Sequence, residues 1–175
     1  MVAVPGQLTT AALLLKLYLG DDLPIIVVSF DKIPKVVLEG QADLGLLIHE
    51  GQITYEALGL TKILDLGKRW FQETSLPLPL GVNVVRRDLG DELGMKLSQA
   101  IRASLQYARA HFDEALQDAL QYGRGIDAET CRRFIQMYVN EYSVTLGEKG
   151  RAALESLYRR AEAAGLLRAP TLDII

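Results

Sequence analysis

The sequence has almost no cysteine and no long apolar run. Its single cysteine, Cys131, cannot form a disulfide within the chain. No apolar run reaches the ~18 residues that a membrane-spanning helix needs. Residues 1–6 have neither the basic region nor the apolar region of a signal peptide. We therefore expect a cytoplasmic protein.

Neither sign of charge is in large excess. The chain has 19 Lys and Arg against 22 Asp and Glu, for a formal net charge of −3, which gives no electrostatic reason to bind nucleic acid or an anionic membrane. Phosphate-binding loops, GxGxxG, GxSxG and Cys/His clusters are also missing from the sequence. Their absence argues against nucleotide-cofactor, serine-hydrolase and zinc chemistry.

What the sequence does contain is apolar material for a core. Hydrophobic residues make up 49% of the 175 positions, which suffices for one domain or two small lobes. In the first half, short apolar runs alternate with helical stretches, and this alternation favours a mainly parallel sheet flanked by helices. The predicted strands are residues 2–4, 25–30, 43–48, 61–66 and 81–86; the predicted helical stretches are 10–19, 32–39 (ended by Gly40) and 55–58.

After Asp88 the apolar pattern changes to the period of a helix. The first helix has an apolar face formed by Leu93, Leu97, Ala100, Ile101, Leu105 and Ala108. Further helices are predicted at 112–122, ended by Gly123-Arg124-Gly125, at 127–142 with Asp127 as cap, and at 147–164. The pattern predicts an α/β ligand-binding lobe over residues 1–87 and a helical segment over residues 88–175.

The first candidate for a ligand site follows the first predicted strand. Gly6 permits a tight turn there, and Thr9 and Thr10 stand at the start of a helix. Helix N-termini leave about four N–H groups free and carry partial positive charge, so they favour carboxylate or phosphate. The alternative is that one threonine merely caps the helix.

The second candidate is His49, which ends a predicted buried strand. Open α/β sheets bind ligands outside the carboxyl ends of their strands, and histidine is the side chain most easily used as a base near neutral pH. The alternative is a structural histidine. His111 lies in a polar connection between helices, where we expect it to face solvent.

Other residues give weaker indications of function. Glu50 either orients a neighbouring group or is solvated, and Asp65 is expected to cap a turn. Tyr55 and Trp70 suit either a pocket for a flat ring or ordinary core packing.

Several motifs stand in a fixed order along the chain: Val4-Pro5-Gly6 with Thr9-Thr10-Ala11, Leu47-Ile48-His49-Glu50 leading to Thr54-Tyr55, Leu76-Pro77-Leu78-Pro79-Leu80-Gly81, Arg86-Arg87-Asp88-Leu89-Gly90, and Leu146-Gly147-Glu148. Together they resemble the motifs of the 1,4-dihydroxy-6-naphthoate synthase family of the futalosine route to menaquinone. The resemblance covers nearly the whole chain, and its second and third motifs are the most specific.

The resemblance implies a two-lobed fold similar to type II periplasmic solute-binding proteins. It implies a cytoplasmic lyase that binds a small carboxylate substrate between its lobes, needs no cofactor, and converts cyclic dehypoxanthine futalosine to 1,4-dihydroxy-6-naphthoate. The resemblance also implies that His49 corresponds to the family's catalytic histidine, a general base. Thr9 and Thr10 would contact polar groups of the ligand, and Gly6, Glu50 and Tyr55 complete the predicted substrate-binding set.

The sequence differs from the family in having no N-terminal lobe segment before Val4-Pro5-Gly6. We therefore expect residues 1–87 to form one lobe, with one wall of the active site absent. Two apolar helix faces are then expected to need a partner surface, and to be buried either by rearrangement of the chain or by self-association. These faces are Leu93/Leu97/Ile101/Leu105 and Leu154/Leu157/Ala161. We expect a homodimer, formed by simple association or by domain swapping.

Three other functions stay open from the sequence. The first is chorismate dehydratase, which shares the fold and the pathway. The second is a binding module that captures a small anion without chemistry, and the third is a half-protein made for the study of folding. Substitution of His49 discriminates between an enzyme, which would lose turnover, and a binding module, which would keep its affinity.

Overall fold

A computed structural model describes residues 1–123 and 125–175 and shows two compact units. The first unit is Met1–Gly81 with Lys149–Thr171, and the second is Val82–Glu148 with Leu172–Ile175. Of the predicted helix stop at Gly123-Arg124-Gly125, Arg124 lies outside the described residues. The division into 1–87 and 88–175 stays a prediction about lobes; the compact units differ from it because residues 149–171 group with the first.

The first unit contains a three-stranded parallel sheet in the order β2-β1-β3. The strands are β1 (Val2–Val4), β2 (Ile25–Val27) and β3 (Leu44–Gly45). Because all three run in the same direction, their carboxyl ends lie at one edge of the sheet. The chain is therefore a mixed α/β protein with a small parallel sheet, as predicted.

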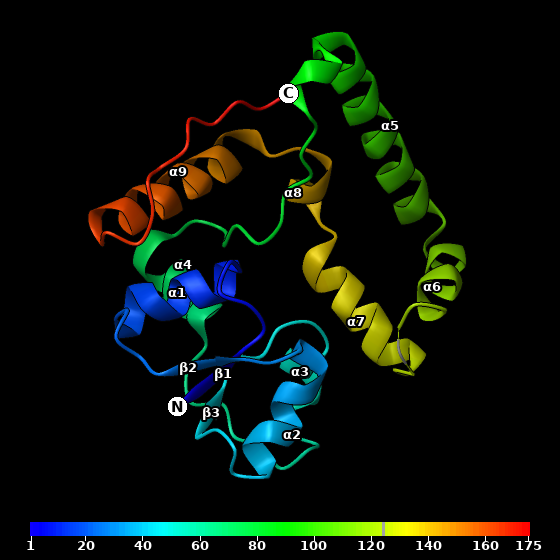
Figure 1. The fold of residues 1–175 in the computed structure, drawn as a ribbon. Helices are drawn as coiled ribbons and strands as arrows, with labels where there is room; N and C mark the ends of the chain where they lie inside the picture. Colours follow the sequence, from blue (N-terminus) through cyan, green and yellow to red (C-terminus); the bar gives the residue numbers. More distant parts are fainter. Residues whose placement is uncertain (124) are drawn as a thin grey trace. The chain divides into compact units, whose positions relative to one another are not determined.

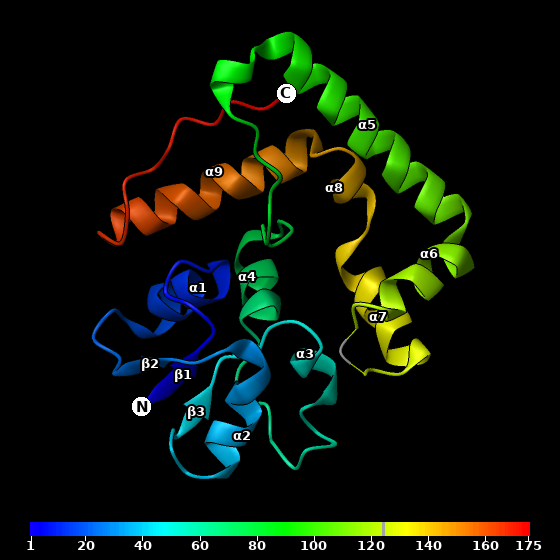
Figure 2. The same cartoon turned by 45° about the vertical axis from the view of Figure 1, so that its right-hand side comes forward.

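β1 is the centre of this sheet, and all of its residues are buried. Val2 and Val4 pack with Leu15 of α1 (Thr10–Leu19), whereas Ala3 packs with Ile33 of α2 (Ile33–Leu38). Since successive side chains of a strand point to opposite faces, α1 and α2 cover opposite faces of the sheet (Figures 1 and 2). This explains why β1 is apolar at every position.

The close packing of α2 on β3 requires a glycine. A Cβ atom added to Gly45 would lie 2.6 Å from Cγ2 of Ile33 and 3.0 Å from Cγ2 of Val37, both on α2. A larger residue at this position would push the helix away from the strand. Gly40, predicted as the end of α2, has a left-handed φ of 70°, and its N–H donates to the carbonyl of Val37.

The remaining helical elements of the first unit are η1 (Phe30–Lys32), α3 (Gly51–Thr54), α4 (Leu66–Thr74) and most of α9 (Gly147–Ala163). Leu14 of α1, Trp70 of α4 and Leu157 of α9 form one buried cluster. Leu154, Leu157 and Ala161, one of the two faces expected to need covering, are all buried within the first unit, so this face needs no second chain.

The second unit consists of η2 (Arg87–Leu89), α5 (Asp91–Ala110), α6 (Phe112–Leu120), α7 (Ala128–Tyr138) and α8 (Glu141–Val144). Asp127 caps α7 as predicted, since its Oδ1 accepts from the N–H of Thr130 at 2.9 Å. The predicted helix over 127–142 is interrupted, because Asn140 caps the separate helix α8.

The long helices of the second unit bury few residues. The buried residues of α5, α6 and α7 are Gly94, Leu116 and Cys131. On α5, the side chains of Leu93 and Leu97 are 40% exposed and that of Ile101 is 42% exposed. We call Leu93, Leu97 and Ile101 the α5 row; it stays partly exposed, whereas Leu105 of the same predicted face is half-buried.

Several predicted strands are shorter than expected or missing. β2 ends at Val27, three residues early, and β3 is reduced to Leu44–Gly45. Residues 61–66 and 81–86 form no strand: Ile63 is 77% exposed and Val84 is 89% exposed. Their β-branched composition favoured strands, but a strand also needs a neighbour for its backbone groups. The helical turn predicted at 55–58 is preceded by α3, which was not predicted.

None of the helices within residues 1–123 and 125–175 has both the length and the apolar composition needed to span a membrane.

Trp70 and Phe71 are adjacent aromatic residues of α4 with opposite environments, since Trp70 is fully buried and Phe71 is 59% exposed. We expect Trp70→Ala to lower the free energy of unfolding by about 3–5 kcal/mol through the cavity it leaves. Phe71→Ala is expected to cost less than about 1 kcal/mol. Urea denaturation followed by circular dichroism measures both, and equal losses would contradict the described packing of α4.

Thr9 is the N-cap of α1, because its Oγ1 accepts from the N–H of Ala12 at 3.1 Å. Thr9→Ala is expected to destabilise the protein by about 1 kcal/mol, whereas Thr9→Ser keeps the oxygen and should retain most of the stability. Thermal denaturation of the two variants checks this. A Thr9→Ser variant as unstable as Thr9→Ala would show that the cap is not the stabilising contact.

Candidate functional site

The strand order makes β1 a topological switch point, where successive connections leave for opposite sides of the sheet. From β1 the chain passes through α1 to β2 on one side, and α2 then returns it to β3 on the other side. Open α/β sheets bind ligands outside the carboxyl ends of strands at such a point. The segments that follow β1 and β3 there are residues 5–10 and 46–50, and they contain most of the predicted site residues.

The hydroxyl groups of Thr9 and Thr10 are both engaged within the protein. Thr9 Oγ1 donates to the carbonyl of Gly6 at 2.9 Å while it caps α1, and Thr10 Oγ1 donates to the carbonyl of Leu80 at 3.0 Å. The structure thus gives Thr9 the capping role that the sequence left open. The first-turn N–H groups of α1 have no acceptor inside the helix, and groups of this kind can bind an anion.

Gly6 is not required by the conformation of its own turn. It is absent from the glycines with a left-handed φ, and an added Cβ would meet only Cγ2 of Thr9, at 3.4 Å. A glycine at such a position lets a ligand approach the backbone closely. The predicted substrate-binding role of Gly6 stays a prediction.

His49 is exposed and lies between β3 and α3. Its φ of 54° is in the left-handed region, which is uncommon for a residue other than glycine. Strained residues of this kind often occur at functional sites. The imidazole lies against the ring of Phe30, with 4.4 Å between ring centroids and 38° between ring planes.

Glu50 directly follows His49, and Tyr55 is the C-cap residue of α3. Glu50 is the N-cap residue of α3, and its carbonyl accepts from the N–H of Ile53 at 2.9 Å. The Tyr55 hydroxyl donates to Oε1 of Glu56 at 2.9 Å, and this hydrogen bond to a carboxylate raises the pKa of Tyr55. Their predicted contact with substrate stays a prediction.

Trp70 and Asp65 have structural roles. Trp70 is fully buried, and its Nε1 donates to the carbonyl of Pro77 at 3.0 Å. Asp65 caps α4, since its Oδ1 accepts from the N–H of Lys68 at 2.9 Å. That backbone hydrogen bond lowers the pKa of Asp65, and the ammonium of Lys62 adds to the effect.

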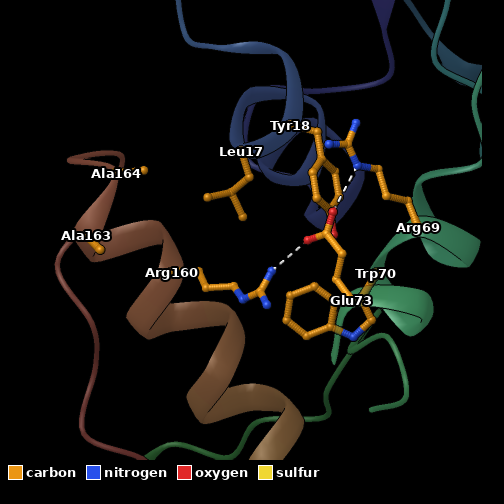
Figure 3. A pocket seen from close by; sticks show the side chains of 8 residues that line it. All are labelled: Leu17, Tyr18, Arg69, Trp70, Glu73, Arg160, Ala163 and Ala164. Carbon is orange, nitrogen blue, oxygen red and sulfur yellow. Dashed lines mark hydrogen bonds and ion pairs between the residues drawn. The ribbon is translucent and has the colours of Figure 1, made fainter. Parts of the chain in front are cut away.

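A hollow of about 500 Å³ lies elsewhere in the first unit, lined by Leu17, Tyr18, Arg69, Trp70, Glu73, Arg160, Ala163 and Ala164. Figure 3 shows the carboxylate of Glu73 between two guanidinium groups. Its oxygens accept from Nε of Arg69 at 3.0 Å and from Nη1 of Arg160 at 3.1 Å. These hydrogen bonds lower the pKa of Glu73. Because Glu73 already occupies the position between the two arginines, we assign this cluster to holding α9 on α4.

Of the residues predicted to bind or react with substrate, all but Tyr55 lie in these two segments at the carboxyl edge of the sheet, and none lines the hollow. Trp70, the weaker candidate for a ring pocket, does line it. Phe30 was missed because the sequence predicted a strand through it. The turn-forming residues Ser29 and Asp31 on either side of Phe30 indicate that the strand ends earlier. Among the described residues, no group of three or more His, Cys, Asp and Glu is arranged to hold a metal ion.

Comparison with known proteins gives concordant matches. A family model described as menaquinone biosynthesis matches residues 1–163. Two curated relatives are named 1,4-dihydroxy-6-naphthoate synthase. The one from Thermus thermophilus is 42% identical over 165 residues, which is 94% of this chain and 60% of the relative. The one from Streptomyces coelicolor is 38% identical over 173 residues, which is 96% of this chain and 61% of the relative.

A solved structure also matches. The crystal structure of a protein from Archaeoglobus fulgidus is similar with a TM-score of 0.91 and 48% sequence identity, covering 95% of this chain and 62% of that one. The chain spans about 60% of the length of the curated relatives it matches. From the matched residues, the identities and the shared fold, we conclude that the chain belongs to the menaquinone biosynthesis family, among relatives of the 1,4-dihydroxy-6-naphthoate synthase type.

Proposed function

We propose that the chain carries the catalytic base and one ligand-binding wall of a 1,4-dihydroxy-6-naphthoate synthase. The reaction breaks a carbon–carbon bond of cyclic dehypoxanthine futalosine and releases 1,4-dihydroxy-6-naphthoate. The observation that carries the proposal is the exposed His49 after β3, at the same sheet edge as the turn between β1 and α1. Because the chain spans about 60% of the curated relatives, the reaction itself is part of the proposal.

Each predicted residue has a role that its position allows. His49 accepts a proton from the substrate as general base, since imidazole is suited to proton transfer near neutral pH. The first-turn N–H groups of α1 bind a carboxylate of the substrate. Thr9 and Thr10 fix that turn through their hydroxyl groups.

Gly6 gives the substrate access to the backbone. Glu50 and Tyr55 line the side of the site next to His49. No cofactor or metal takes part in the proposed reaction.

We also propose the fold and the cellular location that the family resemblance implies. Residues 1–87 would be one lobe of a type II periplasmic-binding-protein-like fold, and the reaction would take place in the cytoplasm. The small parallel sheet with helices on both faces supports the first point. The family resemblance supports the second.

Two alternatives are less well supported. Chorismate dehydratase of the same pathway is not favoured, because both curated relatives are named as the naphthoate synthase. A module that binds a small anion without chemistry would use the N-terminus of α1 but would not need His49.

The function is tested by incubating the purified chain with cyclic dehypoxanthine futalosine and following the naphthoate product by chromatography. His49→Ala is expected to lose turnover by ~10²-fold or more, because the base is removed. His111→Ala is the matched control, since His111 stacks on Tyr107 in the second unit. Unchanged turnover in His49→Ala would refute the proposal that His49 is the general base. A well-folded chain without turnover that still binds the product would favour the binding module.

We also propose that the chain forms a homodimer, by simple association or domain swapping. The α5 row presents three apolar side chains that stay partly exposed in the described chain, and identical faces of this kind pair readily about a two-fold axis. Light scattering at micromolar concentration should give the mass of a dimer for the wild type. Leu97→Glu is expected to give a monomer, because it puts a charge in the interface.

Met95→Glu is the control for the dimer, because Met95 is 50% exposed on the same helix but outside the α5 row. It should leave the dimer intact. A monomeric wild type, or the same mass for both glutamate variants, would contradict the proposed interface.

A further inference from the structure

We infer that Phe30 is a positioning residue for His49, and this inference rests on the proposed role of His49 as the base. The two rings come from loops after different strands, since Phe30 follows β2 and His49 follows β3. β1 lies between these strands in the sheet, so the contact spans the end of β1. It thus lies at the edge where the turn through Gly6 leaves the sheet.

The loop after β2 fixes Phe30 from both sides. The N–H of Val28 donates to the carbonyl of Val4 at 2.9 Å, so the pairing with β1 continues one residue past β2. The N–H of Lys32 donates to the carbonyl of Ser29 at 2.9 Å, and the Ser29 hydroxyl donates to the carboxylate of Asp31. Phe30 is therefore the first residue of a short helical turn tied directly to the sheet, with a half-buried side chain.

The backbone of His49 is fixed as well. The N–H of Leu46 donates to the carbonyl of Ala3 at 2.8 Å, and the carbonyl of His49 accepts from the N–H of Gln52 at 3.2 Å. These bonds hold the main chain, but they do not set the side-chain torsions of His49. The ring of Phe30, 4.4 Å away and tilted by 38°, limits the directions in which the imidazole can turn.

The phenyl ring of Phe30 can orient the imidazole of His49, but it cannot donate or accept a proton. It has no ionisable group, so the contact constrains the imidazole without using a ring nitrogen in a conventional hydrogen bond. Misplacement of a catalytic group lowers the rate of the chemical step more than it lowers binding. Loss of the ring of Phe30 should therefore reduce kcat and leave KM almost unchanged.

The contact can be measured by NMR because the chain has only two histidines. Each histidine lies against one aromatic ring, and the ring centroids of His111 and Tyr107 are 4.0 Å apart. The ring current of the neighbour shifts the Cε1 proton of each imidazole. Phe30→Leu is expected to move only the His49 resonance, and the matched Tyr107→Leu only the His111 resonance. Phe30→Tyr keeps the ring and should keep the His49 resonance near its wild-type position.

Steady-state kinetics of the Phe30 variants give a second test. Phe30→Leu should lower kcat by about 10-fold or more with KM within about 2-fold, and Phe30→Tyr should restore most of kcat. An unchanged His49 resonance in Phe30→Leu, or an unchanged kcat, would overturn the inference. If the wild-type chain itself shows no turnover, the proposed function fails, and the NMR result alone then decides whether Phe30 orients His49.

Discussion

Burial of β1 between two parallel neighbours is the constraint on which the first unit depends. Val2–Val4 pair with β2 on one side and, through Val2 and Ala3, with β3 on the other, while α1 and α2 cover the two faces. This arrangement fixes where the strands end. It therefore determines that the turn before α1, the loop at Phe30 and the loop at His49 leave the sheet at one edge.

Local patterns predicted the elements whose determinants lie close together in the sequence. Thr9 as cap of α1, Gly40 after α2 and Asp127 before α7 are each recognised within a few residues. The strands expected at 61–66 and 81–86 failed because composition does not reveal whether a pairing partner exists. The burial of Leu157 against Trp70 also could not be predicted, since the two residues belong to distant segments of the chain.

For the candidate site, too, the sequence predicted local positions but not contacts between distant segments. Position at the end of a strand was enough to select His49, but not to show its left-handed backbone or its contact with Phe30, which depend on the tertiary structure. The sequence left Thr9 open between capping and anion binding. The structure shows its hydroxyl in the cap, so we propose anion binding only for the backbone N–H groups of α1.

If substrate binds where the segments after β1 and β3 leave the sheet, the proposed product should bind there too. Titration of ¹⁵N-labelled protein with 1,4-dihydroxy-6-naphthoate, followed by amide chemical shifts, should then move residues 6–11 and 48–51 most, with little change around Glu73. Shifts concentrated around Tyr18, Glu73 and Arg160, with residues 6–11 and 48–51 unmoved, would contradict this expectation and place the ligand in the hollow between α4 and α9.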